Sequence, residues 1–234
     1  MRVLPPRFSA FGWLQAFSPL LLLVAGAGVS VGRLCAEGPP TKTIVIFGDS
    51  LAAGYGVSPA DAYPSVIDRW IRDTGLPFRV ANAGVSGDTT AGGTRRIDWV
   101  LKRPVDVLVL ELGGNDGLRG LAPAQTRSNL VSIIHRTRAA YPKVQVVIAG
   151  MQMPSNLGPD YTTAFRELFP AVAKSESTAL IPFLLDGVGG VAALNQADQI
   201  HPNAEGHRRV ATNVWQVLEP VLRSVARAAA PESK

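Results

Sequence analysis

Residues 43–51, with the sequence TIVIFGDSL, carry the strongest indication of the fold. Residues 43–47 form an uninterrupted run of β-branched and apolar side chains, and Gly48 ends it. A strand with one face in water alternates apolar and polar residues, whereas a continuous apolar run is typical of a strand buried on both faces. The stretch therefore predicts a strand in a sheet that is covered on both sides.

Other parts of the chain repeat this pattern and alternate with helical segments. Further strands are predicted at 78–81, 106–112 (DVLVLEL), 144–149 and, most weakly, 180–184. Helices are predicted near 61–73, 90–102, 123–140, 160–174 and 203–225. Repeated strand–helix units predict an α/β fold, in which a parallel sheet carries helices on both faces. Ligands of such sheets bind beyond the carboxyl ends of the strands, so functional residues are expected there.

The charge distribution argues against a partner such as nucleic acid. The formal net charge is +5. Arg2, Arg7 and Arg33 lie within the first 36 residues, which contain no acidic residue, so 20 basic and 18 acidic residues remain. This small excess is not the electrostatic footprint of a polyanion-binding protein. A disulfide framework is also excluded, because the chain has one cysteine.

Residues 1–36 have the features of a secretory signal peptide. Two arginines precede an apolar run at 20–31, and small residues follow it. We expect cleavage after Ala36, which would also remove Cys35, and a periplasmic or secreted protein. The alternative is an uncleaved membrane anchor, which Pro19 and several glycines disfavour. The remaining chain is predicted to comprise a short lead at 37–42, a single domain at 43–226 and a flexible tail at 227–234.

Polar groups with chemical potential follow each of the first three predicted strands. Ser50 follows the first strand, Gly87 the second and Asn115 the third. A serine hydroxyl at a strand exit is accessible for nucleophilic attack, while a glycine N–H and an asparagine amide can donate to an oxyanion. Each also has a structural interpretation: Asp49 or Ser50 as a helix cap, and the two glycine-rich loops as plain turns.

A carboxylate and an imidazole lie near the C-terminus. Asp198 precedes His201 by three residues, so the carboxylate can hold one ring nitrogen while the other accepts a proton from a serine. The alternative is an ordinary surface turn. His135 is predicted to be solvated on a charged helix, and His207 to be a packed or capping residue. Three histidines without a cysteine partner do not favour a metal site.

In chain order, Ser50, Gly87, Asn115 and His201 resemble the four sequence blocks of the GDSL, or SGNH, hydrolases. The resemblance covers nearly all of 43–225. It is closest to the bacterial periplasmic thioesterase I, lysophospholipase and arylesterase branch, at 48–55, 85–89 (VSGDT) and 111–120 (ELGGNDGLRG). It implies a three-layer α/β/α sandwich with a flavodoxin-like, five-stranded parallel sheet, no cofactor and a monomeric state.

The resemblance also implies a mechanism. Ser50 would attack an ester or thioester carbonyl while His201, oriented by Asp198, accepts its proton. The N–H groups of Ser50 and Gly87 and the Asn115 amide would hold the oxyanion. The substrates would be aryl esters, lysophospholipids or acyl thioesters, with transient contact to membrane lipid.

Other residues are assigned with less direct support. Asp49 and Asp116 are expected to shape loops rather than to react. An apolar groove for the acyl group is expected in and around a substrate loop at 151–161, although methionines also fill gaps in cores. Its expected walls are Leu51, Met151, Met153, Leu157 and Tyr161.

Three alternative functions are considered. The first is a carbohydrate O-deacetylase with the same site and a polar groove. The second is an exported binding module without catalysis. The third, a nucleotide-binding flavodoxin-like protein, is disfavoured because the first loop at 48–51 is built around one serine beside an acid.

Overall fold

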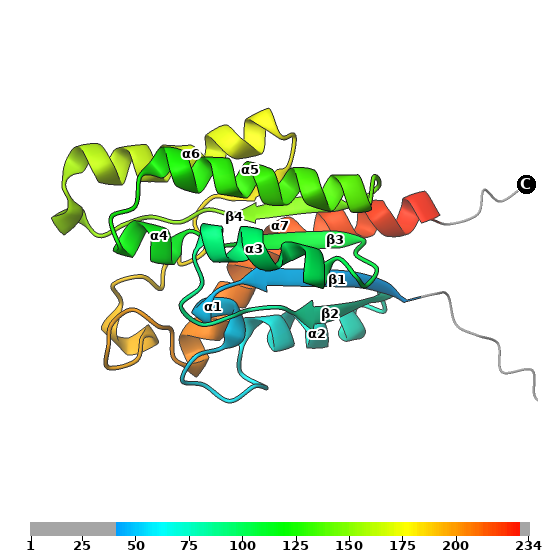
Figure 1. Ribbon diagram of the computed structural model, residues 1–234. Helices are drawn as coiled ribbons and strands as arrows, with labels where there is room; N and C mark the ends of the chain where they lie inside the picture. Colours follow the sequence, from blue (N-terminus) through cyan, green and yellow to red (C-terminus); the bar gives the residue numbers. More distant parts are fainter. Residues whose placement is uncertain (1–40, 230–234) are drawn as a thin grey trace, which may run out of the picture. The chain divides into compact units, whose positions relative to one another are not determined.

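The structure is a computed structural model that describes residues 41–229 (Figure 1). The predicted signal peptide at 1–36 and its cleavage site lie outside the described residues, as do 37–40 and 230–234. The first strand begins at Lys42, one residue inside the predicted lead. None of the helices within 41–229 combines the length and the apolar character needed to cross a bilayer.

Five parallel strands form the sheet, in the order β2-β1-β3-β4-β5. Their bounds are β1 (Lys42–Gly48), β2 (Phe78–Asn82), β3 (Val107–Glu111), β4 (Gln145–Ala149) and β5 (Ala179–Ile181). The chain moves outward from β1 to β2 and then returns past β1 to β3. The sheet therefore has a topological switch point between β1 and β3, where α/β proteins bind ligands.

Helices cover both faces of this sheet, as Figure 1 shows. On one face, α3 (Thr90–Val100) packs beside α5 (Pro123–Ala140), which packs beside α6 (Pro159–Ser175). On the other face, α2 (Tyr63–Asp73) packs against α7 (Ala204–Ala229). The predicted three-layer α/β/α sandwich with a five-stranded parallel sheet is confirmed.

The continuous apolar strands lie in the core because both of their faces are covered. All five residues of β3 are buried, and so are residues 43–48 of β1. The rings of Phe47, Phe165 and Phe169 are completely buried in the same cluster. Burial of an apolar side chain stabilises the fold by about 1.5–3 kcal/mol, so these strands and the helices over them contribute much of the stability.

Two predicted element ends differ from the structure by three residues or more. The last strand is Ala179–Ile181 rather than 180–184, because Pro182 has no N–H with which to continue the ladder. Helix α7 continues to Ala229, so residues 227–229 are helical and not part of a tail. The alanines at 226, 228 and 229 explain this extension, since alanine has the highest helix propensity.

Short helical segments at the carboxyl end of the sheet were not predicted. They are α1 (Ser50–Ala53), α4 (Gly114–Leu118) and the 3₁₀ turns η1 (Ser155–Leu157) and η2 (Ala192–Leu194). Each is too short to show a helical periodicity in the sequence. Helix α1 follows β1, and α4 follows β3, so these two segments flank the switch point and carry Ser50 and Asn115.

Candidate active site

Ser50 lies at the first position of α1, directly beyond β1. Its Oγ is 3.0 Å from Nε2 of His201, a residue 151 positions away in the sequence. The side chain of Asp49 caps α1 by accepting the N–H of Leu51 at 3.0 Å. This hydroxyl–imidazole distance is within the range that allows a histidine to act as the base for a serine nucleophile.

The other nitrogen of the His201 ring is held by Asp198. The distance from Nδ1 to Oδ2 is 2.6 Å. The second oxygen of Asp198 accepts the backbone N–H of His201 at 3.0 Å and that of Ile200 at 2.9 Å. The hydrogen bonds from the His201 backbone and ring and from Ile200 lower the pKa of Asp198 to about 2. The carboxylate is therefore ionised at neutral pH and orients the imidazole.

The loop that carries Asp198 and His201 has a tight turn between them. Gln199 has a φ of 58°, in the left-handed region that few side chains adopt. The ring of Tyr55, which follows α1, lies 4.6 Å from the His201 ring, centroid to centroid. Neither Gln199 nor Tyr55 was predicted to contribute. Both residues lie in loops and act through backbone conformation or ring packing, which no local sequence motif indicates.

Two of the three expected oxyanion donors, Ser50 and Asn115, follow β1 and β3 at the switch point, and the third, Gly87, lies in the loop after β2. Among the described hydrogen bonds, the N–H groups of Ser50 and Gly87 have no acceptor. The Asn115 amide donates to Oδ2 of Asp49 at 3.1 Å and to the carbonyl of Asp88 at 2.9 Å. The second bond ties Asn115 to the Gly87 loop. Because Gly87 has a φ of 78°, its turn suits glycine and no other residue without strain.

Arg96 of α3 joins the loops of the nucleophile and of Gly87. Its guanidinium donates to the carbonyl of Gly48 at 2.9 Å, to that of Ala83 at 2.8 Å and to the Asp88 carboxylate at 2.6 Å. It also lies 3.9 Å above the Phe47 ring. These bonds span the exits of β1 and β2 and hold the two loops at a set separation. Arg96 was not among the predicted site residues.

Asp49 and Asp116 have the loop-shaping contacts expected for them. Oδ1 of Asp49 caps α1, and Oδ2 accepts from Asn115. Asp116 accepts the N–H of Thr90 at 2.9 Å and bonds to the hydroxyls of Thr90 and Thr126. It thereby fastens α4 to α3 and α5.

Glu111, the last residue of β3, is completely buried beneath the nucleophile. Its Oε2 accepts the backbone N–H of Asp49 at 3.1 Å and that of Ala52 at 3.3 Å. Burial, with the Asp49 carboxylate nearby, raises the pKa of Glu111 well above its usual range. Burial likewise raises the pKa of Asp49 to about 6. Sequence reasoning did not identify Glu111, although a charged residue inside the apolar run DVLVLEL was a detectable signal.

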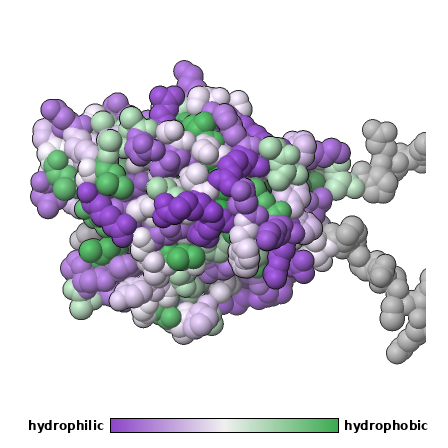
Figure 2. All heavy atoms as spheres, in the orientation of Figure 1, coloured by the Kyte–Doolittle hydropathy of each residue, from purple (hydrophilic) through white to green (hydrophobic). Residues whose placement is uncertain are grey.

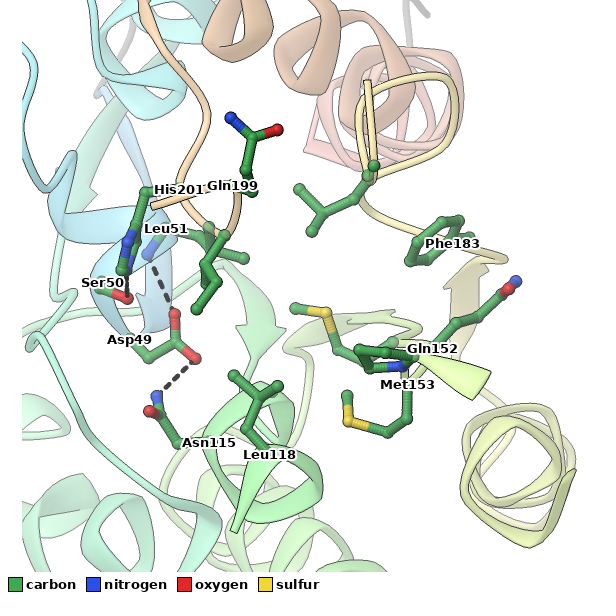
Figure 3. Close-up of a pocket in the computed structure, with 17 residues that line it drawn as sticks. Asp49, Ser50, Leu51, Asn115, Leu118, Gln152, Met153, Phe183, Gln199 and His201 are labelled. Carbon is green, nitrogen blue, oxygen red and sulfur yellow. Dashed lines mark hydrogen bonds between the residues drawn. The ribbon is translucent and has the colours of Figure 1, made fainter. Parts of the chain in front are cut away.

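A groove of about 690 Å³ opens beside Ser50 and His201 (Figure 3). Three predicted wall residues, Leu51, Met151 and Met153, line it. Further walls come from α4, the segment after β4 and the segment after β5: Leu118, Gln152, Pro154, Phe183, Leu185, Gly189 and Gly190. Most of these side chains are apolar, and Figure 3 shows Leu51, Leu118 and Phe183 around the space that Ser50 and His201 border.

Two of the expected groove residues lie elsewhere. Leu157 and Tyr161 are not among the side chains that line the groove. The Tyr161 hydroxyl donates to the carbonyl of Leu121 at 2.7 Å, and its ring stacks on Phe165 at 5.8 Å. Tyr161 therefore fastens α6 to the end of α4 behind the groove wall.

The two remaining histidines have structural contacts. His135 is exposed on α5 and lies 2.9 Å from the Glu176 carboxylate. His207 is buried in α7, accepts the Tyr63 N–H at 3.3 Å through Nδ1, and stacks on the Tyr63 ring. Burial lowers the pKa of His207 to about 4. The predicted packed role of His207 is confirmed.

His207 is expected to make the domain less stable in mild acid. An unfolded histidine takes up a proton near pH 6.5, whereas folded His207 stays neutral down to about pH 4. The unfolded chain therefore binds more protons between these values, and stability falls as the pH falls. From pH 7.5 to 5.0 this loss amounts to about 2 kcal/mol. His207→Asn keeps an acceptor for Tyr63 but removes the titration, so its unfolding free energy should depend less on pH by that amount.

Urea unfolding at the two pH values measures this difference. The raised pKa of Asp49 gives an opposite slope, but it is present in both proteins and cancels in the comparison. Equal slopes for wild type and His207→Asn would show that His207 is not the acid-sensitive group.

Within the described part of the chain, no group of three or more histidine, cysteine, aspartate or glutamate side chains is arranged to hold a metal ion.

A nucleophilic serine, an imidazole and a carboxylate at the carboxyl edge of a parallel α/β/α sheet define the class of serine hydrolases with a three-layer fold. The chain belongs to the GDSL-like lipase/acylhydrolase family, whose sequence profile matches residues 46–209. The predicted family resemblance is confirmed.

Two relatives match this chain over nearly their whole length. The chain is 43% identical over 202 residues to Esterase TesA of Pseudomonas aeruginosa, which covers 86% of this chain and 98% of that protein. It is 35% identical over 217 residues to Thioesterase 1/protease 1/lysophospholipase L1 of Escherichia coli K12, covering 92% of this chain and 96% of that protein. A crystal structure of TesA superposes with a TM-score of 0.74 at 43% identity, covering 77% of this chain and 99% of that one.

Proposed function

We propose that the chain is an exported serine hydrolase that cleaves carboxylic esters and thioesters through an acyl-enzyme on Ser50. One observation carries this proposal: Ser50 Oγ lies 3.0 Å from His201 Nε2, and Asp198 holds the opposite ring nitrogen at 2.6 Å, beside an apolar groove. The names of the relatives, an esterase and a thioesterase/lysophospholipase, support the same reaction class.

The reaction proceeds in two acyl transfers. The Ser50 hydroxyl proton passes to Nε2 of His201 as Oγ attacks the carbonyl carbon, and the carbonyl oxygen becomes an oxyanion. The Ser50 and Gly87 N–H groups and the Asn115 amide hold this oxyanion. His201 then gives its proton to the departing alcohol or thiol. A water molecule, deprotonated by His201, attacks the acyl-enzyme and releases the carboxylic acid and free Ser50.

The groove supports an acyl chain as the group that binds beside Ser50. Leucine, methionine and phenylalanine side chains provide most of its walls. Besides Ser50, Asn115 and His201, the polar side chains that line it are Asp49, Gln152 and Gln199. An O-acetylated sugar presents many hydroxyls, which such walls would leave without hydrogen bonds. We therefore favour aryl esters, lysophospholipids and acyl thioesters over a carbohydrate O-deacetylase. The complete Ser50, His201 and Asp198 set argues against a silent binding module.

Transient contact with membrane lipid is part of this proposal. Among the described residues, all the large exposed apolar side chains except Trp99 lie in segments at the carboxyl end of the sheet. These side chains are Tyr55, Val85, Leu118, Leu121, Val191 and Ile200. Figure 2 shows apolar side chains among polar ones at the end of the domain where α1 and α4 lie in Figure 1. A monomer that leaves this end free would admit acyl substrates from a lipid surface. Export and cleavage after Ala36 rest on the sequence of 1–36 alone.

Longer acyl chains are expected to raise kcat/KM, because the groove can bury more of their apolar surface. Each buried methylene contributes about 0.8 kcal/mol, so kcat/KM for p-nitrophenyl esters should rise about fourfold per added methylene until the groove is filled. Leu118→Ser removes an apolar wall and should lower the ratio of octanoyl to acetyl ester kcat/KM by about three- to tenfold. The measurement is a chain-length series, with acetylated xylan as the polar competitor.

Leu121→Ser provides a matched control for this experiment. Leu121 lies three residues beyond Leu118 and has a similar exposure, 39% against 45%, but does not line the groove. Its chain-length ratio should stay at the wild-type value. Preferential release of acetate from xylan, with no gain for longer acyl esters, would favour the deacetylase instead.

A further inference from the structure

Glu111 is a buried acid that the catalytic cycle does not use. Its side chain has no exposed surface, and it lies at the end of β3 next to Gly48 of β1. One oxygen, Oε2, accepts two backbone N–H groups from the segment that carries Ser50: those of Asp49 and Ala52. The other oxygen, Oε1, is buried without a hydrogen-bond partner among the described residues.

The position of Glu111 explains the glycine that precedes Asp49. A Cβ atom at Gly48 would lie 2.1 Å from Oε2 of Glu111 and 2.9 Å from its backbone oxygen. Real atoms do not approach so closely, so any other residue at 48 would displace the Glu111 carboxyl. Gly48 therefore provides the space through which this carboxyl reaches the amides of the next turn.

The amides of the nucleophile turn can be accounted for one by one. Helix α1 has only four residues, and a helix leaves its first N–H groups without partners inside the helix. Glu111 accepts those of Asp49 and Ala52, and the Asp49 side chain accepts that of Leu51. The N–H of Ser50 alone is left without an acceptor in the described hydrogen bonds. Because the neighbouring N–H groups already have acceptors, the Ser50 N–H is the donor of this turn that can bind the substrate oxygen.

The surroundings of Glu111 disfavour a negative charge. Among the titratable groups, Glu111 and Asp49 act on each other, the His201 ring acts on Asp49, and both carboxyl groups raise the pKa of the buried Tyr63 phenol. The Arg96 guanidinium is bonded to the carbonyls of Gly48 and Ala83 and to the Asp88 carboxylate, and Glu111 has no ion pair among the described residues. A buried carboxylate without a cation, close to a second carboxyl group, is strongly destabilised and holds its proton instead.

We propose that Glu111 is a positioning residue whose neutral carboxyl group holds the Asp49 and Ala52 amides, and so directs both the hydroxyl and the N–H of Ser50 toward one carbonyl group. This inference rests on the proposed function of Ser50. Glu111 acts through the backbone of the nucleophile turn and does not touch the substrate.

Two conservative variants separate the effect of the length of the Glu111 side chain from the effect of its charge. Glu111→Gln keeps an oxygen at the same reach and is neutral, so kcat should remain within about threefold of wild type with an unchanged pH profile between pH 5 and 9. Glu111→Asp keeps the acid but withdraws the oxygen by one methylene, so the turn is no longer held. Displacement of a reacting group by about 1 Å can cost a hundredfold in rate, so kcat should fall about 10- to 100-fold while KM changes little.

The rates are best expressed per folded active site, counted by fluorophosphonate labelling of Ser50. This normalisation removes any loss that is due to unfolding. Thr137→Ala serves as a control for destabilisation, because its buried hydroxyl bonds only to the carbonyl of Ile133 in its own helix. It should lower the melting temperature and leave kcat per labelled site unchanged.

Each outcome decides the matter. A Glu111→Gln protein that loses more than tenfold in kcat would show that a negative charge is needed, and a Glu111→Asp protein with wild-type kcat would show that the reach is not needed. Either result overturns the proposal. Ser50→Ala is assayed in parallel: if it remains active, the proposed function fails, whereas an inactive Ser50→Ala with an active Glu111→Asp rejects only the role of Glu111.

Discussion

Ser50→Ala is expected to lower kcat for ester hydrolysis by about 10⁴- to 10⁶-fold, the range found when the nucleophile of a serine hydrolase is removed. Under the proposed function, the hydroxyl oxygen forms the acyl bond, and among the described residues Ser50 is the one hydroxyl that bonds to His201 Nε2, at 3.0 Å. Substrate affinity should change much less, because the groove walls are untouched. The loss should therefore appear in kcat rather than in KM.

Labelling gives an independent readout of the same residue. A fluorophosphonate should add to the peptide that contains Ser50 in the wild-type protein and to no peptide in Ser50→Ala. Ser58→Ala is a suitable control, because Ser58 is exposed on the loop after α1 and its hydroxyl bonds to Asp61. Near-native esterase activity in Ser50→Ala would sink the assignment of a Ser50 acyl-enzyme.

Asn115→Ala should reduce kcat by about 10²- to 10³-fold, the usual cost of one oxyanion donor, which corresponds to about 3–4 kcal/mol. In the resting site both amide hydrogens of Asn115 have acceptors, Asp49 Oδ2 and the Asp88 carbonyl. We expect the oxyanion to take over one of these hydrogens. Because the charge on the carbonyl oxygen develops in the transition state, KM should change little.

A second asparagine separates catalysis from stability. Asn213 of α7 also donates from its amide to two carbonyls, those of Leu184 at 3.0 Å and Asp186 at 2.8 Å, and does not line the groove. Asn213→Ala should therefore lower the melting temperature without lowering kcat per labelled site. If the two variants lost kcat equally, Asn115 would be a structural residue and not an oxyanion donor.

The sheet was predictable because each inner strand is buried on both faces and therefore reads as an unbroken apolar run. The order of strands and helices follows directly from that pattern. The prediction was least accurate for the edge strand β5, since only three residues pair before Pro182 ends the ladder. At the other end, the helix propensity of the alanines at 226, 228 and 229 carries α7 beyond its apolar periodicity.

The candidate site was predictable where one side chain follows one strand, as for Ser50 and Asn115, and where a pair is local, as for Asp198 and His201. The supports of the site were not predicted. Arg96 and Glu111 act through backbone carbonyls and amides, which have no residue type to recognise in a sequence. The charge of Glu111 inside an apolar run marked an unusual position but did not indicate its partners. The groove was predicted only in part, again because of a backbone partner. The Tyr161 ring is apolar enough to line a groove, but its hydroxyl donates to the carbonyl of Leu121 and so holds the side chain elsewhere.

Ser50 and His201 are 151 positions apart in the sequence, which has a consequence for the order in which the site is synthesised and folds. Ser50 directly follows β1, the first strand of the described residues, and His201 lies in the loop before α7, the last described helix. Chains emerge N-terminus first, so early intermediates can assemble the centre of the sheet long before the imidazole arrives. We therefore expect a nascent chain that still lacks the loop of Asp198 and His201 to be chemically inert. Under the proposed function, hydrolytic activity would be acquired late, when this loop packs beside Ser50.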